Sequence, residues 1–102
     1  LTTDTTLVTV PAGKKYALTT IIVCNNGIDD GAGTNNTKVD IHVIPNGQSK
    51  SDANRIINDL PIDGADTFTF SAERLILEDG DTVVCVGASP TVLSATLSFL
   101  EV

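Results

Sequence analysis

The chain contains a single histidine, His42, and a Ser-His-Asp catalytic triad would have to use it. His42 alternates with apolar residues and shares its side of the segment with Lys38 and Asp40, so we expect a solvated side chain on the polar face of a strand. The sequence contains no GxSxG, HExxH, P-loop or dinucleotide-binding pattern. We therefore expect no catalytic residue and a protein that is not an enzyme.

Two acidic clusters are the remaining candidates for a metal site, Asp29-Asp30 and the run 78–81. Calcium takes about six to eight oxygen ligands from a loop with alternating carboxylates and a closing glutamate. The first cluster lacks that alternation, and the second occupies a turn too tight to wrap an ion. We therefore expect neither a metal nor a cofactor.

The two cysteines, Cys24 and Cys85, each lie inside an apolar run. They could be separate thiols that act as small hydrophobic residues, or they could form one disulfide between an early and a late strand. No CxxC spacing indicates a metal-binding pair. The residues alone leave both alternatives open.

The composition describes one small acidic globular domain, residues 1–102, in which 41% of the residues are apolar. The net charge of −7 argues against nucleic acid as a partner, because phosphates are bound by basic groups. No apolar run approaches the ~20 residues that span a bilayer, so we expect no membrane segment. Tryptophan is absent, which argues against a strong sugar-stacking site.

The pattern of apolar residues has the two-residue period of strands and includes no long helical segment. Turn residues divide it about every ten residues, with Pro11 and Gly13 in the first turn and Gly80 and Asp81 in a late Asp-Gly hairpin. The expected fold is all-β, an antiparallel, jelly-roll-like β-sandwich of seven to eight strands. The expected strands cover 5–10, 16–26, 37–44, 53–60, 67–71, 74–77, 82–88 and 92–102.

The stretch 7–26 resembles a hairpin whose second strand, 16–26, is apolar on both sides. Simple alternation places Leu18, Ile22 and Cys24 on one face and Ala17, Ile21 and Val23 on the other. A strand that is apolar on both faces is covered on both, one by the core and the other by a neighbouring molecule. The residues 1–10 could also add a strand to a neighbour's sheet. The candidate interface residues are Leu7, Val8, Val10, Tyr16, Leu18, Ile21 and Val23.

The order of segments resembles the small β-sandwich virion proteins of tailed bacteriophages, which share a "TVPAGK … LPI … GD" arrangement. The pieces that carry the resemblance are 8-VTVPAGKKY-16, 21-IIVCNN-26, 60-LPI-62 and 75-LILEDGDTVVCVGAS-89. The resemblance implies a jelly-roll-like structural protein with no catalytic residues, in which Gly13, Gly80 and Asp81 serve as turn residues.

This resemblance also implies a location and partners. The expected location is the virion, assembled in the reducing bacterial cytoplasm, which argues further against a disulfide. The expected partners are the major capsid protein or tail proteins, together with further copies of the chain. A trimer would explain the two-sided apolar strand. The chain also has no methionine, so we expect a processed, trimmed or partial chain.

The leading hypothesis is a capsid decoration or cement protein that stabilises the head through subunit contacts. The alternative is a tail or fibre module that binds a host receptor or glycan through the loops 27–36 and 45–52. The first of these loops is longer than the resemblance predicts. Its expected exposed contact residues are Asp29, Asp30, Asn35 and Asn36.

Overall fold

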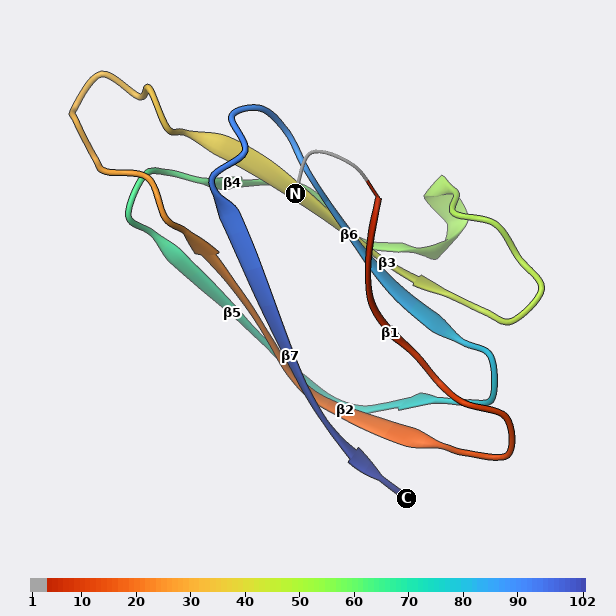
Figure 1. Ribbon diagram of the computed structural model, residues 1–102. Coiled ribbons are helices and arrows are strands. Elements are labelled where there is room, and N and C mark those ends of the chain that lie inside the picture. Colours follow the sequence, from red (N-terminus) through yellow and green to blue (C-terminus); the bar gives the residue numbers. More distant parts are fainter. Residues whose placement is uncertain (1–3) are drawn as a thin grey trace.

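The computed structural model describes residues 4–102, and the side chains of all of these except 72–74. The chain forms a β-sandwich of two antiparallel sheets with strand orders β1-β6-β3-β4 and β5-β2-β7 (Figure 1). The strands are β1 Thr5–Thr9, β2 Tyr16–Asn25, β3 Thr37–Ile44, β4 Arg55–Ile62, β5 Thr67–Leu77, β6 Thr82–Gly87 and β7 Leu93–Glu101. The predicted fold class is therefore confirmed.

Two predicted hairpins are wrong, because the strands that they would join lie in different sheets. The strand β1 pairs with β6, whereas β2 pairs with β5 and β7. The turn 78–81 likewise carries the chain from one sheet to the other. The strands β3 and β4 are the one consecutive pair that is hydrogen-bonded in the described chain. The order of the described strands matches that of an eight-stranded jelly roll without one outer strand, whose place is beside β7.

The two turns at one end of the sandwich are hydrogen-bonded to each other. The Val10 amide donates to the Asp81 carbonyl, and the Gly80 amide donates to the Val10 carbonyl, each at a distance of 3.0 Å. The Gly13 amide donates to an Asp79 carboxylate oxygen, also over 3.0 Å. Gly13 and Gly80 have φ of 76° and 80°, a conformation that favours glycine.

The segment 53–60, expected as a strand, contains most of β4, preceded by one short 3₁₀ turn at Asp52–Asn54. The segments 67–71 and 74–77, expected as separate strands, form the single strand β5. An irregularity divides that strand, because Ser71 lies opposite Thr20 and Leu75 lies opposite Leu18. The two halves of β5 therefore correspond to the two predicted strands.

A bulge in β2 decides which side chains enter the core. The pairing of β2 with β7 shifts between Leu18 and Thr20, so that one extra residue lies on β2. Leu18, Ile21 and Val23 therefore share the inner face, and the predicted division of this strand into two faces is wrong. The inner residues pack in one core cluster with Val10, Val39, Ile41, Ile62, Leu77, Val83, Cys85 and Leu93.

Candidate interaction surface

His42, the candidate catalytic residue, is buried rather than solvated, with 2% of its surface exposed. It lies on the outer side of β3, where the connection between β3 and β4 covers it. Its Nδ1 atom lies 2.8 Å from Oδ1 of Asn54. Asn54 also accepts a hydrogen bond from the Ser51 amide and donates one to the Ser49 carbonyl. His42 thus anchors a loop, and the expectation of a surface histidine is wrong because alternation along β3 says nothing about this cover.

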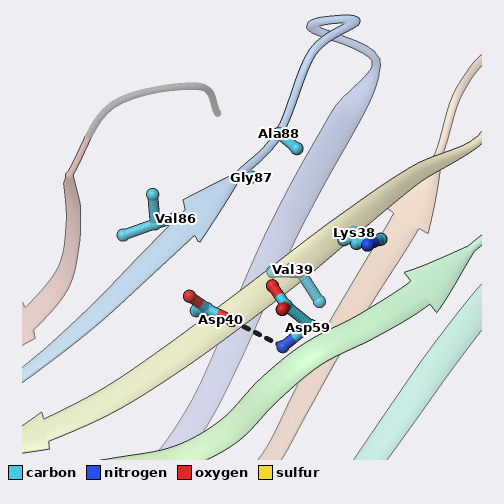
Figure 2. Close-up of a pocket in the computed structure, with 7 residues that line it drawn as sticks. All are labelled: Lys38, Val39, Asp40, Asp59, Val86, Gly87 and Ala88. Carbon is cyan, nitrogen blue, oxygen red and sulfur yellow. Dashed lines mark hydrogen bonds between the residues drawn. The ribbon is translucent and has the colours of Figure 1, made fainter. Parts of the chain in front are cut away.

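An open pocket of about 190 Å³ lies further along the same outer face, beside β3, β4 and β6. Figure 2 shows Asp40 and Asp59 close together in it, with Lys38 nearby on β3. The Asp40 carboxylate accepts a hydrogen bond from the Asp59 amide over 2.6 Å and lies 4.0 Å from Nε of Arg55. The Asp40 carboxylate is therefore already held by the protein's own groups.

No group of three or more His, Cys, Asp and Glu residues is arranged to hold a metal ion among the residues whose side chains the structure describes. Cys24 and Cys85 are both free thiols, Cys24 half-exposed and Cys85 buried. Burial raises the pKa of the Cys85 thiol to about 11, so this thiol is protonated at neutral pH. Cys85 therefore lacks the features of an activated nucleophile.

The loop 27–36 is folded against the protein by its own side chains. Asn25, buried at the end of β2, donates to the Asn35 carbonyl over 2.7 Å and to the Ile62 carbonyl over 3.0 Å. Asn36 accepts a hydrogen bond from the Gly64 amide. Of the predicted contact residues, Asn35 and Asn36 thus contribute to holding the loop in place.

The other two predicted contact residues of this loop, Asp29 and Asp30, are exposed and brace the turn that follows them. Asp29 accepts a hydrogen bond from the Gly31 amide over 3.1 Å. The Asp30 carboxylate accepts hydrogen bonds from Thr34 and from the Ala32 amide, and these lower its pKa. Their exposed carboxylates leave the tip of the loop acidic.

The two loops expected to form a receptor or glycan site lie far apart. Figure 1 shows 27–36, after β2, at one end of the sandwich and 45–52, after β3, at the other. The structure therefore does not bring them together into one site.

The structure places the predicted interface residues mostly inside the protein. Val10, Leu18, Ile21 and Val23 are at most 1% exposed and belong to the core. The remaining three are half-buried and pack against that core, Leu7 and Val8 from β1 and Tyr16 from the start of β2. The expected free strand at 1–10 contains β1, which pairs with β6 of its own sheet, and residues 1–3 lie outside the described part.

The predicted turn residues all lie in the paired turns at one end of the molecule. Pro11 accepts a hydrogen bond from the Lys14 amide, which closes the turn that contains Gly13. Asp81 accepts from the Asn46 and Glu78 amides and so ties the turn that contains Gly80 to a neighbouring loop. Their role in this arrangement is structural.

The surface that sequence reasoning missed is the outer face of the β5-β2-β7 sheet. Ile22 lies at its centre and is 37% exposed, with Thr69 opposite it on β5 and Thr96 on β7. We call this surface the neutral face, because none of its twelve residues is charged and none is buried: Ala17, Thr20, Ile22 and Cys24 of β2, Thr67, Thr69, Ser71 and Ile76 of β5, and Ser94, Thr96, Ser98 and Leu100 of β7.

The neutral face is unusual in a chain with 13 acidic and six basic residues. Two further exposed aliphatic side chains, Ile76 and Leu100, flank Ala17 on neighbouring strands. Charged residues are commonly depleted from the buried centre of protein–protein interfaces, and exposed strand faces of soluble domains usually carry them. A signal was available in the sequence, because Ser and Thr alternate with apolar residues and no charge occurs in the runs 67–71 and 94–98.

In the described part of the chain, no helix is long and apolar enough to cross a membrane. Comparisons of the chain with models of protein families, with curated proteins and with solved structures find no match.

Proposed function

We propose that this protein is a non-enzymatic structural subunit that docks its neutral face onto another protein, and that the assembly is a bacteriophage virion, where it decorates the capsid. The neutral face carries the proposal of docking. A three-stranded surface whose described side chains carry no charge, with Ile22, Ile76 and Leu100 exposed on it, loses little solvation when it is covered. The virion as the site of assembly rests on the resemblance of the turn and strand segments.

The mechanism would be mechanical. Serine and threonine hydroxyls can hydrogen-bond across an interface, and the aliphatic side chains supply apolar area. A single small face of this kind gives modest affinity, but many copies on one particle add their contacts. The acidic loop tip at Asp29 and Asp30 would remain in solvent.

Heads that lack the protein, prepared from the phage that encodes it, provide the test. The Ile22→Glu variant places a charge at the centre of the neutral face and should weaken head binding at least about tenfold, which corresponds to about 1.4 kcal/mol. Heads that bind the wild type should also rupture at a higher temperature.

Ile56→Glu is the matched control, because Ile56 is an equally exposed isoleucine, at 42% against 37%, on the other sheet. We expect this variant to bind heads like the wild type. Equal loss in both variants, or no binding by the wild type, would contradict the proposal. Binding of host cells that disappears when 27–36 is shortened would instead support the receptor-binding alternative.

A further inference from the structure

The two sheets end in four edge strands, and three of these are distorted. The strand β1 bulges between Thr6 and Val8, where two steps along β1 match one step along β6. The strand β4 gains an extra residue twice against β3, and within it Asp59 has a φ of 49° and Pro61 lacks an amide hydrogen. The strand β5 is irregular between Ser71 and Leu75. Bulges and proline are features that discourage an edge from pairing with another strand.

The fourth edge strand, β7, has none of these features. The bulge in its pairing with β2 lies on β2, so consecutive residues of β7, Ser98 and Phe99, remain in regular extended structure. The run 93–100 contains neither a charge nor a proline. The one charged residue of the strand, Glu101, is neutralised by Lys14, whose Nζ lies 2.9 Å from its carboxylate.

The backbone groups on the outer side of β7 can be identified from its register. The Asn26 amide donates to the Val92 carbonyl over 2.7 Å, which marks a hydrogen-bonded pair. Such pairs recur at every second residue, so Ser94, Thr96 and Ser98 direct their backbone groups to β2. The intervening residues, Ala95 and Leu97, direct their N–H and C=O groups away from the sheet. In the described chain β7 pairs with β2 alone, so these groups form an open edge.

The fold itself leaves room for one more strand at this place. In the jelly-roll order the missing outer strand lies beside β7, antiparallel to it. The neighbouring edge strand of the other sheet is β1, and its five residues are also uncharged. The side of the sandwich formed by these two strands therefore carries one charged strand residue, Glu101, at its end.

We propose that β7 pairs antiparallel with β7 of a second copy of this chain, around a two-fold axis near Leu97. For contact between two copies, charge favours this edge, because two chains of net charge −7 repel each other wherever their carboxylates meet. The β7 edges can meet without opposing charges, and each offers the other the same set of free backbone groups. Edge-to-edge pairing of this kind supplies affinity mainly through main-chain hydrogen bonds.

The dimer would join two β5-β2-β7 sheets into one continuous sheet and two neutral faces into one surface. This inference does not depend on the proposed function, because the edge of a sheet and its face are separate surfaces. It also predicts an even-numbered assembly built from isologous pairs.

Sedimentation velocity of the whole chain, from micromolar to millimolar concentration, tests the proposal with two matched variants. Thr96 and Thr69 are both exposed on the neutral face and lie on either side of Ile22, but Thr96 is on β7 and Thr69 is on β5. Thr96→Glu brings like charges together beside the two-fold axis and should raise the dimer dissociation constant at least about tenfold. Thr69→Glu should leave the dissociation constant unchanged, although both variants put a charge on the face that the proposed function uses.

Hydrogen exchange of the wild type gives a readout without mutation. The amides of Ala95 and Leu97 should exchange more slowly as the concentration rises, while the Thr69 amide, on the outer side of β5, stays fast. A wild type that is monomeric throughout, a trimer, or equal dissociation of both variants would overturn the proposal. Failure here with intact head binding would leave the proposed function standing.

Discussion

The outer face of the β1-β6-β3-β4 sheet carries its own cover, whereas the neutral face of the other sheet is bare. On the first, His42 and Val84 are only 2% and 6% exposed, although both point away from the core. Asn54, at the end of the connection 45–54, contacts the His42 ring, and Arg55 bridges Asp40 and Asp52. On the second, every described outward side chain of β5, β2 and β7 is at least partly exposed, and none carries a charge. Each sheet of a sandwich needs only one apolar face, the one that packs in the core. The comparison shows that a loop of the protein covers part of the outer face of the β1-β6-β3-β4 sheet.

The first prediction sharpens this comparison within β2, where neighbouring isoleucines face opposite ways. Ile21 is fully buried and Ile22 is 37% exposed. Ile21→Ala should lower the free energy of unfolding by about 3–4 kcal/mol, through lost burial and the cavity left behind. Ile22→Ala should cost less than about 1 kcal/mol, because little area is lost. Urea titration of both variants measures the difference. A similar loss of unfolding free energy in the two variants would contradict the assignment of Ile21 to the core and Ile22 to the surface.

The second prediction breaks the cover on the other face. Asn54→Ala removes the partner of the buried His42 ring and of two backbone groups in the loop. Leaving such groups unpaired should lower the free energy of unfolding by about 2 kcal/mol. Thermal and urea unfolding provide the measurement.

The control for that variant is Asn58→Ala, which removes an exposed amide that contacts Arg55 near the surface. It should change the free energy of unfolding by less than about 0.5 kcal/mol. If Asn54→Ala is as mild as this control, the loop is not anchored through His42.

The fold class and most strand positions could be predicted from the sequence, because alternation and turn residues are local. Strand pairing could not be predicted in the same way. An Asp-Gly turn such as Asp79-Gly80 favours a hairpin locally, but here it binds the turn at Gly13 and leads into the other sheet. The local preference of this turn for a hairpin is overridden by the burial of both sheets against one core.

The face on which each side chain lies was still harder to predict, because one extra residue in a strand moves every later side chain to the opposite face. The bulge in β2 puts Leu18 and Ile21 on the same side, which strict alternation forbids. The burial of His42 could not be predicted either, because it depends on Asn54, twelve positions later, which contacts the His42 ring. The neutral face could have been found from sequence by noting where charges are missing rather than where apolar residues gather.

The sequence run 16–26 therefore has a different meaning in the structure. Its inner residues build the core, and its outer residues, Thr20, Ile22 and Cys24, form the middle of the neutral face. The sequence predicts apolar residues on both sides of this strand, but Ile21 and Val23, which it places at the interface, lie on the inner face.

Alkylation of the two native cysteines tests the central claim, that the neutral face is the surface covered on assembly. Cys24 lies on that face and is half-exposed, whereas Cys85 is buried in the core with a pKa of about 11 and serves as an internal control. In the free protein, iodoacetamide should modify Cys24 and leave Cys85 unmodified. On heads that bind the protein, we expect the rate at Cys24 to fall at least about tenfold, in line with burial of the face. An unchanged rate at Cys24 on fully decorated heads would contradict the account.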